Sequence, residues 1–188
     1  MKKIYALILS VFISACSTGG DVVLQRADNL SRKPDWASET VSSFEQNGVA
    51  YFIGTMSVDG NSSSSWVCMA ASNMAKNNIS SLIRQKLDFV TQIAQEGTDI
   101  GVNQMKYVGT EASDAIVSGL KRDGCYWEKV LTQNDTSSKR VEYKAFVKMS
   151  IPVNRLEQAI RNAAKKQGVS PEFAEQANQR LNETLQRQ

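Results

Sequence analysis

The fold is decided by a strand, a turn and a helix that follow one another directly. The strand has the sequence Val-Ala-Tyr-Phe-Ile-Gly-Thr-Met-Ser-Val at positions 49–58. Tyr51 and Ile53 alternate with Phe52, and the stretch is rich in aromatic and β-branched residues. That composition and period predict a β-strand. The following Asp59-Gly60-Asn61 predicts a turn.

A long amphipathic helix is predicted after the turn. Serines at positions 62–65 offer N-cap residues. Apolar residues then recur at spacings of three and four, which is one helical face: Val67, Ala71, Met74, Ala75, Ile79, Leu82, Ile83, Leu87 and Val90. We expect the helix to end near Gly97. An alternative ends it near Lys86 and makes residues 87–93 a strand, but the stripe continues to Ile93 and favours a single helix.

The middle of the chain predicts a hairpin. Residues 97–109 resemble a loop, and residues 111–120 a short helix with Thr110 as its N-cap. Strands are expected at 124–132 and 139–151. The second strand alternates cleanly through Val141, Tyr143, Ala145, Val147 and Met149. A polar turn separates the two strands, so we expect an antiparallel hairpin.

Two helices are expected near the C-terminus. Asn154 is a candidate N-cap for the first, which Gly168 ends. Pro171 suits the first position of the second helix. The second helix places four apolar residues on one face at spacings of four: Phe173, Ala177, Leu181 and Leu185. This face either docks on the domain or meets a partner.

Together these elements predict an α+β fold. A small antiparallel sheet of about three strands would pack against one long helix, with extra helices at the C-terminus. A chain of 188 residues suits one domain with a hydrophobic core. Pro34-Asp35-Trp36 opens that domain, and Trp36 is expected to anchor the core at its edge, with a binding role as the alternative.

The N-terminus carries an export signal. Lys2 and Lys3 precede an apolar run that is too short to span a bilayer as a helix. Ile13-Ser14-Ala15-Cys16 then resembles the bacterial lipobox at all four positions. The resemblance implies cleavage between Ala15 and Cys16 and acylation of Cys16, for example with palmitate. An ordinary cleaved signal peptide that happens to contain a cysteine is the alternative. Ser17 favours the outer membrane, since an aspartate there would favour the inner one.

The chain therefore divides into four expected parts. Residues 1–15 are the signal peptide, and residues 16–33 are the lipidated N-terminus and a flexible tether. The tether would reach on the order of 20–25 Å. Residues 34–168 form the α+β domain, and residues 169–188 form a C-terminal helix.

Cys68 and Cys125 are the two cysteines that remain once Cys16 is lipidated. An oxidising compartment permits a disulfide between an even pair. Cys68 lies in the first turn of the expected long helix and Cys125 at the start of an expected strand. If that strand runs antiparallel to the strand at 49–58, both cysteines lie at the same end of the sheet. We expect a disulfide, and two buried free thiols are the alternative. A third cysteine or a histidine nearby is missing, which makes a zinc site unexpected.

Composition argues against several functions. The chain has no histidine, which removes the commonest general base and metal ligand. The serines at 62–65 would need a lysine such as Lys76 as their base. No catalytic residue and no metal site are therefore assigned. The net charge of +3 falls to +1 when the leader with Lys2 and Lys3 is removed, which gives no basis for nucleic-acid binding.

Several features together resemble the Lpp-twenty-type lipoprotein family of bacterial outer membranes. They are the lipobox, Pro34-Asp35-Trp36, the glycine-containing strand at 49–58, the alanine-rich helix after it (Ala70, Ala71, Ala75), Gly119 with Trp127, and Tyr143-Lys144-Ala145-Phe146. The resemblance implies a dodecin-like fold, outer-membrane residence and no enzymatic activity. Some members of the family belong to flagellar outer-membrane assemblies. Cys68, Cys125 and the helix after Gly168 depart from the family pattern.

The sequence thus predicts an outer-membrane lipoprotein that is not an enzyme. Its lipid anchor would hold a periplasmic domain that acts by binding, as part of a cell-envelope assembly such as a flagellar or secretion-associated structure. Other envelope proteins or a second copy of the chain are the expected partners, and no cofactor is expected beyond the lipid on Cys16. A small-ligand carrier and a periplasmic hydrolase are the alternatives.

Overall fold

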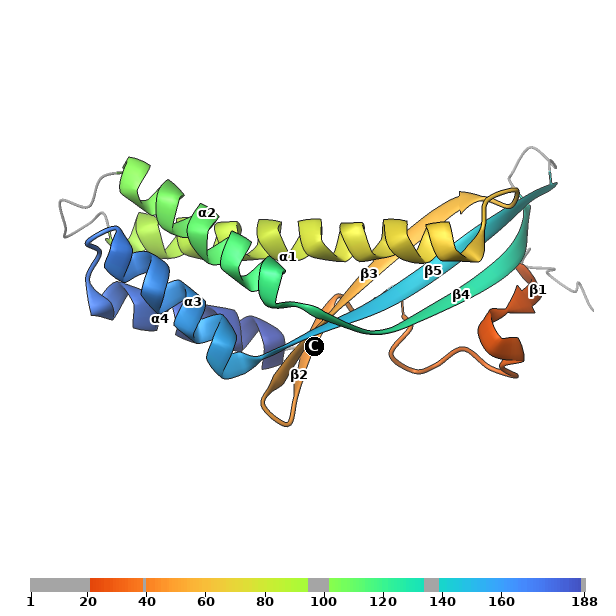
Figure 1. The fold of residues 1–188 in the computed structure, drawn as a ribbon, viewed down its shortest axis with the longest axis horizontal. Helices are drawn as coiled ribbons and strands as arrows, with labels where there is room; N and C mark the ends of the chain where they lie inside the picture. Colours follow the sequence, from red (N-terminus) through yellow and green to blue (C-terminus); the bar gives the residue numbers. More distant parts are fainter. Residues whose placement is uncertain (1–20, 39, 95–101, 134–138, 187–188) are drawn as a thin grey trace, which may run out of the picture.

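The computed structural model describes residues 21–38, 40–94, 102–133 and 139–186. Within them the chain forms an α+β fold with a five-stranded antiparallel sheet and four α-helices (Figure 1). The elements are β1 (Val22–Arg26), the 3-10 helix η1 (Ala27–Asn29), β2 (Ser43–Gln46), β3 (Val49–Asp59), α1 (Ser64–Ala94), α2 (Val102–Gly119), β4 (Lys121–Gln133), β5 (Lys139–Pro152), α3 (Val153–Lys166) and α4 (Pro171–Gln186). The predicted class is confirmed. The expected number of about three strands is too low, because β1 and β2 flank the central three in the order β1-β4-β5-β3-β2.

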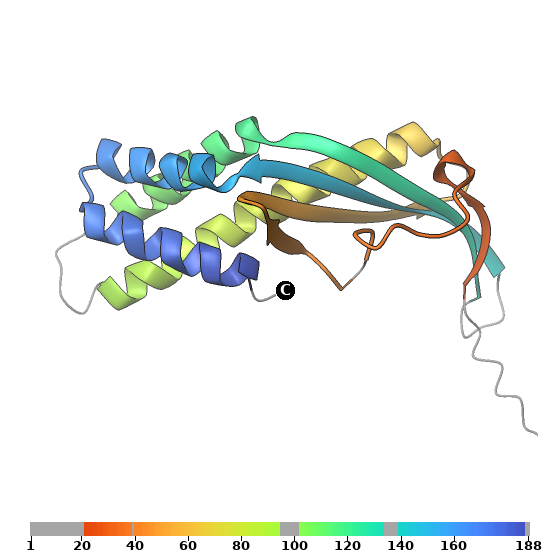
Figure 2. The same cartoon turned by 90° about the horizontal axis from the view of Figure 1, so that it is seen from below.

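The sheet and the helices lie towards opposite ends of an elongated molecule, and α1 belongs to both (Figures 1 and 2). With 31 residues, α1 is about 46 Å long. Its first half covers one face of the sheet, where Val67, Ala71 and Ala75 pack against Tyr143 and Val147. The single long helix is confirmed as far as Ala94; its expected end near Gly97 lies outside the described residues.

Close packing of α1 on the sheet depends on small residues. A Cβ atom at Gly54 of β3 would lie 2.3 Å from the carbonyl oxygen of Ala71 and 2.6 Å from the Cβ of Ala75. Such distances are sterically impossible, so the position accepts only glycine at this spacing of helix and strand. The glycine in the strand and the alanines in the helix therefore set how closely the two layers approach.

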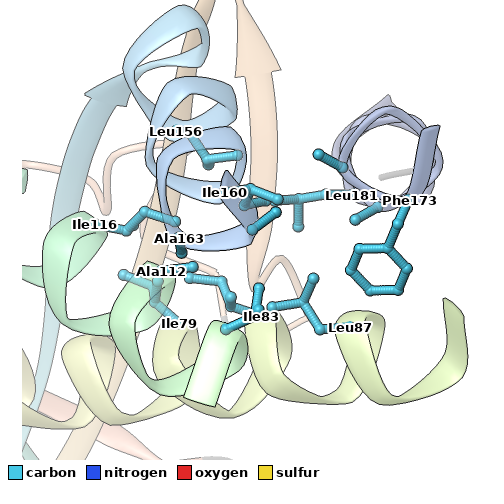
Figure 3. Close-up of a cluster of buried hydrophobic side chains, with 14 of the residues drawn as sticks. Ile79, Ile83, Leu87, Ala112, Ile116, Leu156, Ile160, Ala163, Phe173 and Leu181 are labelled. Atoms are coloured by element: carbon cyan, nitrogen blue, oxygen red, sulfur yellow. The ribbon is translucent and has the colours of Figure 1, made fainter. Parts of the chain in front are cut away.

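The second half of α1 forms a four-helix core with α2, α3 and α4. Figure 3 shows side chains from all four helices pointing towards one another: Ile79, Ile83, Leu87, Ala112, Ile116, Leu156, Ile160, Ala163, Phe173 and Leu181. All of these residues are buried. Burial of this shared apolar surface is the main force that holds the helical end together.

α2 is longer than expected. The predicted loop at 97–109 is wrong from Val102 onward, because α2 begins there. Thr110 is not an N-cap: its hydroxyl donates to the carbonyl of Lys106 inside the helix, at 3.0 Å. Buried Met105 and Val108 continue the apolar period of α2 into the helical core.

The C-terminal helices largely follow prediction. α3 begins at Val153 with Pro152 at its N-cap, so the expected cap at Asn154 is wrong. Gly168 has a φ of +68°, the left-handed conformation that ends a helix. α4 begins at Pro171 and buries its predicted face in the four-helix core. It therefore docks on the domain, and its core is continuous with that of residues 34–168.

The hairpin of β4 and β5 is confirmed, while both edge strands were missed. Residues 21–33 do not form the expected tether, because β1 pairs with β4. β2 pairs with β3 across a turn at Asn47 and Gly48, which have φ values of 53° and 72°. Asn-Gly is the strongest short signal for a hairpin, so this pair was readable from the sequence.

Candidate functional site

The face of the sheet turned away from α1, here called the outer face, carries an unusual set of aromatic and charged side chains. Alternation along the strands puts Tyr51 of β3, Tyr126 of β4, and Phe146 and Lys148 of β5 on this face. The opposite side chains of the same strands pack on α1. Among the described residues no α-helix lies across the outer face (Figure 2); Ala27 of η1 packs there against Tyr126 and Phe146.

The N-terminal segment covers one part of the outer face. Lys144 donates to Asp21 at 2.6 Å, and Arg26 pairs with Glu128 at 3.4 Å. The Nζ atom of Lys33 lies 3.7 Å from the centroid of the Phe146 ring. These contacts fix residues 21–37 against the sheet.

Beneath this segment lies a buried polar pair. The hydroxyl of Tyr126 donates to the carboxylate of Glu128 at 2.6 Å. Burial and this hydrogen bond to Glu128 raise the pKa of Tyr126 to about 12. Arg26 compensates the charge of Glu128. The cluster is satisfied internally, so it stabilises the segment and offers no free acid or base.

A row of half-exposed rings continues across the outer face. Phe44 and Tyr51 stack with their ring centroids 4.9 Å apart. The Nζ atom of Lys148 lies 5.2 Å from the centroid of Tyr51 and 5.4 Å from that of Trp36. Ser150 of β5 donates to Asp123 nearby, at 2.8 Å. This row, from Trp36 through Lys148 and Tyr51 to Phe44, is suited to contact a partner through aromatic surface and one cation.

Sequence reasoning found only part of this face. Trp36 was expected at the domain edge, and it lies half-exposed against Gly124 and Lys148. Phe44, Tyr51 and Lys148 were not singled out. The alternation of β5 was visible, but which of its faces would be covered depends on where α1 and residues 21–37 pack.

Cys68 and Cys125 lie together on the other side of the sheet. Their sulfur atoms are at disulfide distance, 2.03 Å, and their Cα atoms are 6.0 Å apart. Cys68 lies in the second turn of α1 and Cys125 lies on β4. The two cysteines lie close together as expected, but the expected position at one end of the sheet is wrong. β4 runs parallel to β3, because both are antiparallel to β5, and Cys125 lies opposite Val147, level with Gly54 in the middle of β3.

The serines at 62–65 are not brought to a base. Ser63 accepts a hydrogen bond from the backbone N–H of Trp66 and so caps α1. Lys76 lies on the same helix eleven residues after Ser65, which corresponds to about 16 Å along the axis. Lys76 is therefore out of reach of these serines. Within the described ranges, no three acidic or cysteine residues gather in a way that suits a metal ion.

A cleft of about 270 Å³ lies at the edge of the sheet, between β2, β3, α1 and α4. Serine and asparagine side chains line it together with Phe52, Ile53, Ile79 and Leu82. The cleft reaches Ala75 of α1. At Gly54 the strand is in direct contact with Ala71 and Ala75 of the helix.

The first three turns of α1 present a second candidate surface. Residues 61–75 contain no charged side chain. Trp66 is 45% exposed and Met69 is 52% exposed on this stretch. They are three residues apart and so share one side of the helix; we call them the charge-free face of α1. Large apolar side chains grouped in this way are typical of contact surfaces.

The lipidation site cannot be placed in this geometry, because Ala15 and Cys16 lie outside the described residues. None of the described helices is long and apolar enough to cross a bilayer. In comparisons with known proteins, the chain matches no protein-family model and no curated protein sequence.

Proposed function

We propose that this chain is an outer-membrane lipoprotein, anchored through Cys16, whose domain acts by binding another envelope protein as part of a cell-envelope assembly. The domain would face the periplasm. The proposal contains no catalytic step, and its only prosthetic group is the lipid on Cys16.

The lipobox supports the anchor. Ile13-Ser14-Ala15-Cys16 follows a positively charged and then an apolar stretch, as lipidation requires. Two or three acyl chains hold a protein stably on a bilayer. The disulfide distance between Cys68 and Cys125 fits an oxidising compartment such as the periplasm.

The charge-free face of α1 is the observation that carries the binding role. Aromatic residues and methionine are enriched in the cores of protein interfaces, where charged residues are depleted. Trp66 and Met69 stand nearly one turn apart on the same helix and are both about half exposed. A partner that covers them would bury apolar surface without removing any charge on α1 from water.

The resemblance to the Lpp-twenty-type family adds to this proposal. The central strands β3, β4 and β5 wrapped on α1 correspond in outline to the dodecin-like arrangement that the resemblance implies. Under that reading, β1, β2 and α4 are additions to the shared core. A flagellar or secretion-associated assembly remains the proposed setting.

The anchor is tested by metabolic labelling with a radioactive fatty acid. The wild-type chain should incorporate the label and sediment with outer membranes. Cys16→Ser should lose the label and appear in the soluble periplasmic fraction. Ser17→Asp should keep the label and move to the inner membrane. An unlabelled wild-type chain would contradict the anchor.

The binding role is tested by a photo-crosslinking amino acid in intact cells. Placed at Met69, it should give one dominant crosslinked protein, which mass spectrometry identifies. The matched control places the same amino acid at Asn162, an exposed residue of α3. Equal crosslinking at both positions, or none at Met69, would contradict a partner on the charge-free face.

A further inference from the structure

We propose that the β1 edge of the sheet rests on the phospholipid surface, so that Val22 and Leu24 contact lipid and the helical end points away from the membrane. This inference rests on the proposed lipid anchor at Cys16 and adds the surface through which the folded domain meets the bilayer.

The first argument is the distance from the anchor to the fold. Only four residues separate Cys16 from Asp21. Asp21 is already held by Lys144, and β1 begins at the next residue. The Cα atoms of Cys16 and Asp21 are five residues apart in sequence, so they can be separated by at most about 17 Å even in a fully extended chain. The start of β1 must therefore stay within about that distance of the acylated cysteine.

The second argument is the chemistry of β1 itself. Val22 is 56% exposed and Leu24 is 52% exposed, although both belong to an ordered strand. Leu24 falls at an irregularity in the pairing with β4, between Val23 and Gln25. An edge strand that shows two large apolar side chains to water is normally covered or protected. The lipid anchor places a bilayer within reach of both side chains.

The acidic groups near β1 are partly neutralised: three of them are paired with cations, while Asp28 of η1 and Asp59 of β3 are exposed. Glu128 on β4, the strand next to β1, and Glu142 on β5, one strand further, are buried and paired with Arg26 and Arg140. Asp21 is paired with Lys144. Exposed Lys139 lies at the start of β5, at this same end of the sheet, next to Arg140, whose charge is already paired with Glu142; exposed Asp59 lies there at the end of β3. The exposed charge of Lys139 is compatible with an anionic lipid surface.

The elongated shape of the molecule determines which end would lie far from the membrane. β1 lies at one end of the elongated molecule, and α2 and α3 lie at the other (Figures 1 and 2). If β1 rests on the bilayer, α1 carries the four-helix core away from it. Tyr107 of α2 is 62% exposed at that far end, so it serves as a reference point that lipid should not reach.

The test uses the full acylated chain in vesicles of phosphatidylethanolamine and phosphatidylglycerol. An environment-sensitive fluorescent amino acid replaces Leu24 in one protein and Tyr107 in another. The expected result at position 24 is a blue-shifted emission and strong quenching by lipids that carry a nitroxide near the headgroup. At position 107 the emission should stay that of a water-exposed probe, without quenching.

The outcomes separate the two proposals. Mass spectrometry of the purified chain first shows whether Cys16 is acylated; an unmodified cysteine contradicts the anchor. With acylation present, a water-like and unquenched probe at position 24 overturns the lipid contact alone. A blue shift that lacks lipid quenching and grows with protein density also overturns it, in favour of β1 pairing with a second copy.

Discussion

At Gly54 the backbone of β3 and the helix α1 come closer than any side chain would allow. The carbonyl of Ala71 and the Cβ of Ala75 occupy the space that a Cβ would need. Substitution must push the helix away from the sheet, and the displaced helix loses contacts along its whole first half. A single residue therefore decides the distance between the two layers.

Gly54→Ala should lower the free energy of unfolding by about 1–3 kcal/mol, because it overpacks the interface. Urea denaturation followed by circular dichroism measures this change. Gly109→Ala in α2 is the matched control: its Cβ would lie 3.7 Å from the nearest atom, of Leu87. Removing a glycine from a helix interior should raise stability by up to about 1 kcal/mol. Equal effects of the two substitutions would contradict the steric argument.

Ionisation of Tyr126 makes the free energy of unfolding depend on pH in the alkaline range. Its pKa is raised from 10.0 to about 12 in the folded chain. Because the folded-state pKa lies above the unfolded one, the stability from the protonated phenol is complete below pH 10 and is lost towards pH 12. The free energy of unfolding should fall across this window in urea titrations at a series of pH values.

Tyr126→Phe should remove that part of the pH dependence. At neutral pH it should cost about 1–3 kcal/mol, because buried Glu128 loses a hydrogen-bond donor. Tyr107→Phe, at an exposed position, should change neither quantity. A wild-type alkaline profile that persists in Tyr126→Phe would show that another group is responsible.

At the scale of elements, α4 is a member of the core and not an appendage. Its apolar face meets α1 and α3, and Leu181 is fully buried there. Asn178 reaches back to the carbonyl of Glu157 on α3, at 3.4 Å. The sequence offered docking and partner binding as equal readings, because an amphipathic helix looks the same in both cases.

Leu181→Ala should therefore lower the free energy of unfolding by about 2–5 kcal/mol, the usual range for a buried leucine. Gln176→Ala on the exposed side of the same helix should change it by less than about 0.5 kcal/mol. The comparison is made by thermal and urea denaturation. A small effect at Leu181 would mean that α4 does not contribute to the folded core.

At the scale of the whole molecule, two cores share one helix. The buried cluster between α1 and the sheet is separate from the cluster of the four helices, and α1 contributes to both. Cys68 and Cys125 lie 57 residues apart and enclose most of α1 and all of α2. A bond between them would tie the shared helix to the sheet.

Replacing both cysteines by serine should cost on the order of 4 kcal/mol, from the entropy of a 57-residue loop in the unfolded chain. Reducing agent should destabilise the wild-type chain by a similar amount and leave the Cys68→Ser, Cys125→Ser variant unchanged. Titration of free thiols in the unfolded wild-type chain independently measures whether Cys68 and Cys125 are bonded. Two free thiols there would contradict the expected disulfide.

The sequence by itself determined the elements whose pattern is local. Alternation identified β3, β4 and β5, and the spacing of apolar residues identified α1, α3 and α4, because side chains repeat every two residues in a strand and every 3.6 in a helix. The sequence also identified Cys68 and Cys125 as a candidate disulfide pair and residues 13–16 as a candidate lipobox. β2 could have been found from Asn47-Gly48.

Only the tertiary structure decided the rest. β1 has a short sequence that suits a tether until β4 offers it an edge to pair with. The aromatic row assembles Trp36, Phe44, Tyr51 and Lys148 from separate segments. Which face of a sheet is covered, and which apolar residues stay exposed, depends on contacts between distant parts of the chain. Local periodicity contains no information about those contacts, so the exposure of Val22, Leu24 and the charge-free face of α1 was established only in the folded molecule.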